Sequence, residues 1–122
     1  MTVLTSMDRN DLVDLGFPDT VDVRALVLSR ARRALAAGCD GVVASGLEAL
    51  DLRNELAARL LIVVPGIRPF DNIDDQKRTV DVEQAFRNGA DYIVVGRPIL
   101  NAPSPTAAAE QVQERIAAFF AA

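Results

Sequence analysis

The chain has 122 residues, of which half are apolar and a quarter are charged, as expected for one compact domain with a buried core. Its net charge of -4 does not favour nonspecific nucleic-acid binding, and no apolar run approaches the ~20 residues of a membrane helix. The absence of histidine excludes imidazole-based metal sites and histidine-based triads. With one cysteine, Cys39, and no secretory signal, a cytoplasmic protein without an internal disulfide is expected.

The N-terminal third predicts one strand and two helices. Residues 2–6 are short, β-branched and apolar, which favours a strand. Asp8 can cap a brief helix that extends through Leu15, and a second helix follows at residues 22–37. Gly38 ends this second helix. This segment therefore predicts the first strand–helix unit, with an additional short helix.

Three more strand–helix units follow. The apolar run at residues 60–64 does not alternate with polar residues, which indicates a strand buried on both faces of a parallel sheet. In chain order, the predicted elements are a strand at 41–45, a helix at 47–58, a strand at 60–64, a polar loop at 67–80, a helix at 82–88, a strand at 92–95 and a helix at 106–121.

Four strand–helix units in succession predict an α/β fold with parallel strands joined by right-handed crossovers. Four units make half of a (β/α)8 barrel or a small open sheet, since a whole barrel typically uses about 250 residues. A half-barrel leaves two exposed edges and an uncovered inner face. We therefore expect this chain to pair with another one.

Candidate functional residues lie at the carboxyl ends of the predicted strands, where parallel α/β folds carry their sites. This rule selects Thr5 and Ser6, Ser45, residues 65–68, Gly96 and Arg97, with residues 74–78 of the long loop beside them. The pair Gly96–Arg97 is the most suggestive, because glycine admits an oxyanion close to the backbone and a guanidinium matches phosphate oxygens. The alternative is an arginine that only caps the strand end in solvent. Taken singly, Arg68, Thr5 and the charged loop are equally compatible with ordinary surface roles.

Several segments together resemble the bacterial orotidine 5′-phosphate decarboxylase family. The matching stretches are VLTSM at 3–7, DLVDLG at 11–16, DGVVAS at 40–45, VPGIRP at 64–69, DQKR at 75–78 and DYIVVGRP at 91–98. Any one of them is generic to phosphate-binding barrels, whereas the series VPGIRP, DQKR and VVGRP is specific. Their order and spacing fit over nearly the whole chain.

The resemblance implies that residues 1–122 form the C-terminal half of a (β/α)8 TIM barrel, equivalent to its strands 5–8. Phosphate-binding loops are then expected at 65–78 and 96–98. Thr5 would hydrogen-bond the pyrimidine and Pro65 would lie against the base. The ribose 5′-phosphate would be held by Arg68, Gln76, Gly96 and Arg97. The family uses no metal and no organic cofactor, and it converts orotidine 5′-phosphate to uridine 5′-phosphate and carbon dioxide in pyrimidine biosynthesis.

The family's catalytic network, of the form Asp-x-Lys-x-x-Asp, is not found in this chain. Lys77 is the only lysine, and the following aspartate, Asp81, is one residue too far along. Lys77 also lies where the family places its phosphate-binding loop. We therefore expect no catalytic residue here, and an isolated chain that is inactive.

Three explanations of the half-length remain open: an incomplete gene product, which we favour, a self-assembling half-barrel, or one piece of a split enzyme. The leading functional hypothesis is a lyase that needs the missing N-terminal half. The alternative is a noncatalytic, homodimeric half-barrel that binds phosphate or a nucleotide such as orotidine or uridine 5′-phosphate. A sugar-phosphate isomerase or aldolase is a third, weaker possibility. Neither nucleic acid nor a membrane is an expected partner.

Overall fold

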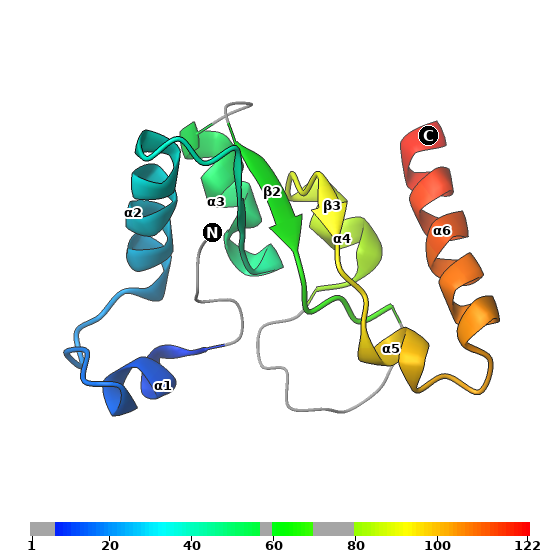
Figure 1. Cartoon of the computed structure of the whole chain (residues 1–122), viewed down its shortest axis with the longest axis horizontal. Helices are drawn as coiled ribbons and strands as arrows, with labels where there is room; N and C mark the ends of the chain where they lie inside the picture. The colour runs from blue at the N-terminus through cyan, green and yellow to red at the C-terminus, as the bar shows by residue number, and fades with distance from the viewer. Residues whose placement is uncertain (1–6, 57–59, 70–79) are drawn as a thin grey trace.

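The structure is a computed structural model that describes residues 7–56, 60–69 and 80–122. The predicted first strand, at residues 2–6, lies outside these ranges. The described elements are, in chain order, α1 (Arg9–Asp14), α2 (Val23–Ala36), β1 (Gly41–Val43), α3 (Gly46–Leu56), β2 (Leu61–Val64), α4 (Val82–Arg87), β3 (Tyr92–Ile93), α5 (Arg97–Leu100) and α6 (Pro105–Ala121) (Figure 1).

The three described strands form one parallel sheet in the order β1-β2-β3. Val42 pairs with Ile62 and Val64 pairs with Ile93, so each strand lies beside the next one in the chain. Helix α3 connects β1 to β2, and α4 connects β2 to β3. The alternation of parallel strands and helices that the sequence predicts is therefore confirmed in this part of the chain.

Local capping explains where the first helices begin. The Asp8 carboxylate accepts the Asp11 backbone N–H at 3.0 Å, and the Asp11 carboxylate accepts the Asp8 N–H at 2.9 Å. Asp22 caps α2 through the N–H of Ala25. These bonds satisfy backbone donors that a helix start leaves unpaired, and those between Asp8 and Asp11 are reciprocal. Within the described ranges, none of the helices is long and apolar enough to cross a bilayer.

The short helix α5 was not predicted from the sequence, where residues 96–98 were expected to form a phosphate-binding loop. Its signal is Pro98, which lies in the first turn of the helix. Proline is favoured there because its missing N–H has no intrahelical partner at that position and its φ already suits a helix. Four residues are too few to show a helical apolar period.

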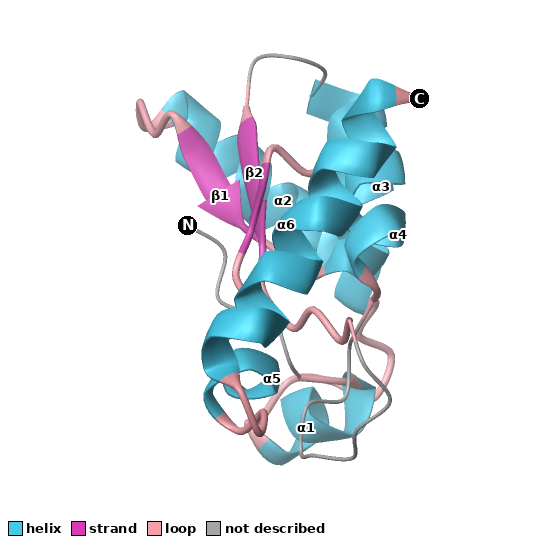
Figure 2. Cartoon of the chain, turned by 90° about the vertical axis from the view of Figure 1, so that its right-hand side faces the viewer, coloured by secondary structure: helices cyan, strands magenta, loops and turns pink. Residues whose placement is uncertain are grey.

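The helices lie mainly on one face of the sheet. Helix α2 packs on β1 and α3, α3 packs on β2 and α4, and α6 packs on α4 and α5. Figures 1 and 2 show α3 and α4 on the same side of the strands. Side chains that point toward this layer, Val42, Ile62 and Val64, are buried. The core therefore lies between the sheet and the helices.

The opposite face of the sheet carries exposed apolar side chains. Leu61 is 47% exposed, Tyr92 61% and Val94 51%. The prediction that residues 60–64 are buried on both faces is therefore wrong for this chain alone: β2 buries Ile62 and Val64 but exposes Leu61. Residues 60–64 are continuously apolar, yet in the described part of the chain helices pack against only one face of the sheet.

Arg53, on α3, forms hydrogen bonds at the amino-terminal end of the sheet. Its guanidinium donates to the carbonyl oxygens of Leu60 and Gly89 and to the Asp91 carboxylate, the last at 2.6 Å. Asp91 also accepts the backbone N–H of Ile62 at 2.9 Å. This cluster fixes the turns that enter β2 and β3, at the end of the sheet remote from the candidate site.

Candidate functional site

The segments that follow the three strands gather at one end of the sheet, together with α5 (Figure 1). Residues 65–68 come directly after β2, and Gly96 and Arg97 follow β3 after two residues. Adjacent parallel strands lie about 4.8 Å apart. The register of β2 with β3 continues past the strands, since the Val94 N–H donates to Val64 O at 3.0 Å. The two predicted phosphate-binding segments therefore emerge side by side.

The segment after β2 forms a stem with the residues that precede α4. Gly66 has φ 71°, a left-handed conformation that turns the chain at little cost only for glycine. Ile67 is fully buried and pairs with Val80 in a parallel bridge. The Arg68 N–H donates to Val80 O at 2.9 Å. We call residues 67–69 and Val80 the stem. It fixes the backbone that carries Arg68, whose half-buried side chain donates from Nη1 to the Ile67 carbonyl oxygen at 2.9 Å.

The segment after β3 presents its backbone to solvent. Gly96 and Arg97 are both exposed, whereas Pro98 is buried and anchors the start of α5. The Gly96 carbonyl is occupied, since it accepts the N–H groups of Ile99 and Leu100, each at 3.0 Å. A Cβ built on Gly96 meets no atom of the described residues within 4 Å. This glycine therefore leaves open space at the strand end.

Ser45, at the end of β1, has a structural role in the described part of the chain. It is 1% exposed, and its hydroxyl accepts the Leu47 N–H at 3.1 Å at the start of α3. The carbonyl of the next residue, Gly46, accepts the side-chain amide of Asn88 at 3.0 Å, which joins α3 to α4. A Cβ on Gly46 would lie 2.4 Å from a Val80 methyl group. This strand end therefore packs against the stem.

The structure brings four of the six predicted binding residues to the same end of the sheet: Pro65, Arg68, Gly96 and Arg97. Thr5 and Gln76 lie outside the described residues. Two guanidinium groups and an open backbone position suit an anion, because arginine can bind phosphate oxygens with two parallel hydrogen bonds. The half-buried Pro65 adds apolar surface beside them. Nowhere in residues 7–56, 60–69 and 80–122 do three His, Cys, Asp or Glu side chains group as metal ligands.

Arg115 is a residue near the stem that sequence reasoning missed. From α6, it donates to Pro69 O at 2.8 Å and forms a two-point ion pair with Glu83 of α4. Hydrogen bonding from Arg115 lowers the pKa of Glu83 below its usual value, and the same bond raises the pKa of Arg115. In the sequence, Arg115 differs in no way from the other arginines on the helices, since its partners are 32 and 46 residues away.

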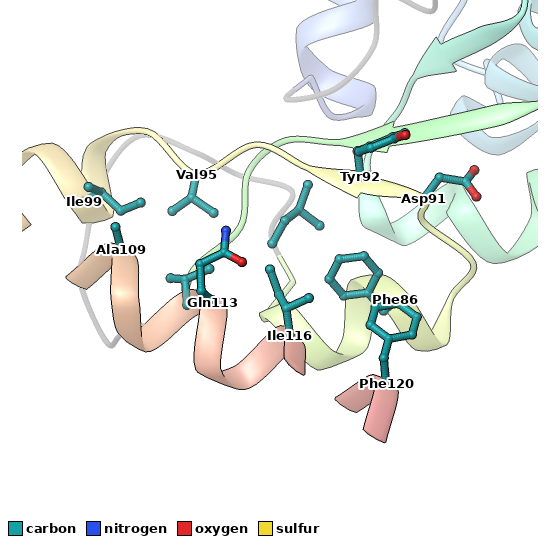
Figure 3. A pocket seen from close by; sticks show the side chains of 11 residues that line it. Phe86, Asp91, Tyr92, Val95, Ile99, Ala109, Gln113, Ile116 and Phe120 are labelled. Atoms are coloured by element: carbon teal, nitrogen blue, oxygen red, sulfur yellow. The ribbon is translucent and has the colours of Figure 1, made fainter. Parts of the chain in front are cut away.

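A separate apolar cavity of about 380 Å³ lies between β3 and α6 (Figure 3). Its wall includes Phe86, Ile116 and Phe120, with the rings of Phe86 and Phe120 5.1 Å apart. The only charged side chain in the lining is Asp91, which already pairs with Arg53. None of the lining residues is an arginine or a lysine that could pair with phosphate oxygens, so this cavity does not suit a nucleotide monophosphate.

Comparisons with known proteins point to one protein family. The family model described as "Orotidine 5'-phosphate decarboxylase / HUMPS family" matches residues 1–112. Orotidine 5′-phosphate decarboxylases from Methylococcus capsulatus and Stenotrophomonas maltophilia are 63% and 55% identical to the chain over its whole length, which covers 50% of each relative. A crystal structure of orotidine 5′-phosphate decarboxylase from Lactobacillus acidophilus superposes on 93% of the chain with a TM-score of 0.74 and 34% identity, and 46% of that protein is covered.

The chain thus spans about half the length of the curated relatives it matches. Its parallel α/β fold corresponds to half of a TIM barrel, as the sequence predicts. Since the family model accounts for all but the last ten residues, the chain belongs to the orotidine 5′-phosphate decarboxylase / HUMPS family.

Proposed function

We propose that this chain is the phosphate- and base-binding half of an orotidine 5′-phosphate decarboxylase. In the completed barrel the enzyme would be a carboxy-lyase that converts orotidine 5′-phosphate to uridine 5′-phosphate and carbon dioxide. The observation that carries this proposal is the emergence of Arg68 and Arg97 from adjacent, hydrogen-bonded strand ends. The names of the Methylococcus capsulatus and Stenotrophomonas maltophilia relatives supply the substrate.

Each described site residue has a role in this proposal. Arg68 and Arg97 would donate to the phosphate oxygens from neighbouring strand ends, and the backbone at Gly96 would approach a third oxygen. Pro65 would contact the pyrimidine. Thr5 and Gln76 would complete the base and phosphate contacts, although both lie outside the described residues. Loops 65–78 and 96–98 would then be the phosphate-binding loops.

Binding of the phosphate group would contribute to catalysis although the phosphate lies away from the reacting carbon. Binding energy from a part of the substrate that does not react can be used to hold the reacting carbon in a desolvated, well-oriented position. Proton delivery to the carbanion left by carbon dioxide needs a general acid. The one lysine of this chain, Lys77, does not fit the family motif for that role. We therefore propose that the reaction requires the other half of the barrel and no metal or cofactor.

The exposed apolar face of the sheet supports an assembly with a partner. Leu61, Tyr92 and Val94 would lie inside a closed barrel, where side chains from the remaining strands would bury them. The same face also favours the second candidate function, a noncatalytic half-barrel that pairs with a second copy and binds a nucleotide or phosphate. A cytoplasmic location remains a prediction from the sequence.

Binding and turnover measurements test the proposal. We expect uridine 5′-phosphate to bind the chain in a calorimetric titration, and uridine, which lacks the phosphate, to bind at least tenfold more weakly, the scale of one charge-assisted contact. Decarboxylation of orotidine 5′-phosphate should stay at background for the chain alone. It should appear when the N-terminal half of the Methylococcus capsulatus relative is added.

The outcomes separate the candidate functions. Equal binding of uridine and uridine 5′-phosphate would contradict the phosphate site. Nucleotide binding without turnover, even with the added half, would favour the noncatalytic half-barrel. A clear preference for a sugar phosphate over uridine 5′-phosphate would instead point to a different barrel enzyme.

A further inference from the structure

Arg115 joins three parts of the molecule that are far apart in sequence. Its Nε donates to one Glu83 carboxylate oxygen at 2.7 Å, and its Nη2 donates to the other. Its Nη1 donates to Pro69 O at 2.8 Å. The guanidinium is planar, so the two bonds to Glu83 fix the direction of the third. The ion pair of α4 and α6 therefore aims one donor at the backbone of the stem.

Pro69 is the residue at which this donor can hold the stem. Proline has no N–H, so its carbonyl is its one backbone hydrogen-bonding group. Pro69 follows Arg68, whose own N–H is bonded to Val80 O. The backbone of Arg68 is thus fixed on one side by Val80 and on the other, through Pro69, by Arg115.

Two other ion pairs join helices in the described part of the chain, and their arginines are more exposed than Arg115. Arg24–Asp51 and Arg32–Glu55 both join α2 to α3, and the arginine side chains are 66% and 55% exposed. The Arg115 side chain is 30% exposed, and Glu83 is 29% exposed. Partial burial reduces the screening that weakens surface ion pairs. The Glu83–Arg115 pair is therefore better suited to fix a backbone position than the other two pairs.

We infer that Arg115, oriented by Glu83, is a positioning residue that holds the stem so that Arg68 is aimed at the phosphate of the substrate. This inference rests on the proposed function for the identity of the ligand. The anchoring of the stem itself depends on the described contacts alone. Glutamate is ionised at neutral pH, and the hydrogen bonds from Arg115 lower the pKa of Glu83 below its usual value.

A charge-swapped double variant, Glu83→Arg with Arg115→Glu, separates two effects of Arg115. One is its hydrogen bond to the stem, and the other is its ion pair between α4 and α6. The swap keeps an ion pair between α4 and α6, but a glutamate at 115 cannot donate to Pro69 O. Arg115→Ala removes both interactions, and Arg24→Ala removes an interhelical ion pair that lies away from the stem. The full chain is used, and amide hydrogen exchange of Arg68 reports on the stem without any ligand.

We expect the Arg68 amide to exchange on the order of tenfold faster in the swap and in Arg115→Ala. Both variants lose the hydrogen bond to Pro69 O, which lowers the free energy needed to open the stem. The amide of Ile62, in the core strand, should keep its protection in the swap, and Arg24→Ala should leave Arg68 unchanged. Affinity for uridine 5′-phosphate should fall on the order of tenfold in the swap, with no change for uridine.

Unchanged Arg68 exchange in the swap would overturn the inference, as would faster exchange with unchanged affinity for uridine 5′-phosphate. If Arg115→Ala loses Ile62 protection, the swap still tests the inference. If the wild-type chain does not bind uridine 5′-phosphate, the proposed function fails. Faster Arg68 exchange in the swap would then still support the anchoring of the stem.

Discussion

At the scale of single residues, the candidate site depends on a glycine whose smallness has no structural explanation in the described part of the chain. Gly96 has a negative φ, and a Cβ there meets no described atom within 4 Å. Gly41 is the opposite case, because a Cβ would lie 2.6 Å from the Leu61 carbonyl oxygen of the adjacent strand. Packing against the adjacent strand therefore requires a glycine at position 41, whereas at position 96 only a bound ligand would require one.

Gly96→Ala should therefore change the free energy of unfolding by less than about 1 kcal/mol, as for other surface changes. It should nevertheless weaken uridine 5′-phosphate binding, because a methyl group would occupy the space next to the exposed backbone. Gly41→Ala, the matched control, should destabilise the fold by about 1–3 kcal/mol through overpacking. Urea unfolding and nucleotide titration check both variants. Unchanged affinity in Gly96→Ala would exclude close approach of the ligand to this backbone.

Arg97→Ala should weaken nucleotide monophosphate binding by about 2 kcal/mol, the scale of a lost charge-assisted contact. Arg33→Ala, which removes an exposed charge on α2, serves as the control for net charge. A calorimetric titration with uridine 5′-phosphate measures both. Equal affinity of Arg97→Ala and Arg33→Ala would remove Arg97 from the site.

At the scale of elements, two arginines connect helices to the strand ends. Arg53 holds the turns that enter β2 and β3, while Arg115 contacts the stem that leaves β2. The Glu83–Arg115 pair should make stability depend on pH. The pKa of Glu83 is lowered in the folded chain, so the pair stabilises the fold above the unfolded-state pKa of about 4.3.

The stabilisation from Glu83 should be lost as the pH falls below this value toward the lowered folded-state pKa. We expect the free energy of unfolding to fall less steeply with acidification in Glu83→Gln than in the wild type. Denaturant unfolding at a series of pH values from about 6 to 3 measures this difference. Parallel pH profiles would show that Glu83 titrates alike in the folded and unfolded chains.

Arg53→Ala should lower the free energy of unfolding by about 2–4 kcal/mol, because two backbone carbonyls and the Asp91 carboxylate lose their donor. The cluster lies at the end of the sheet remote from the site. Affinity for uridine 5′-phosphate, measured under conditions where the variant is folded, should therefore stay unchanged. A large loss of affinity would show that the two ends of the sheet are coupled.

At the scale of the whole molecule, the open sheet face determines how the chain behaves in solution. Leu61, Tyr92 and Val94 expose apolar surface on adjacent strands. Contiguous apolar surface of this kind marks an interaction site or a site of aggregation. Association through this face would bury it.

We expect the purified chain to form a discrete dimer in light scattering, and the double variant Leu61→Glu with Tyr92→Glu to be monomeric. Leu15→Glu, at an equally exposed apolar position beyond α1, should leave the mass unchanged. A wild-type monomer or unspecific aggregates would contradict self-association and favour a requirement for the other half of a barrel. The same measurement with uridine 5′-phosphate tests whether the ligand alters the assembly.

Much of the fold could be predicted from the sequence because its signals are local. The caps at Asp8 and Asp22 and the apolar period of each segment set the helices within one or two residues. The motifs at residues 64–69 and 94–98 also predicted which strand ends carry arginines. The first strand and the positions of Thr5 and Gln76 remain predictions, since they lie outside the described residues.

By itself, the sequence determined the order of the described elements other than α5, the parallel sheet and the family, all of which depend on short-range patterns. The tertiary structure decided that one face of the sheet is open and that Arg115 contacts Pro69. These features join residues far apart in the chain or depend on which surfaces meet. Local propensity carries no information about such contacts, because they arise only when helices and strands pack at particular positions.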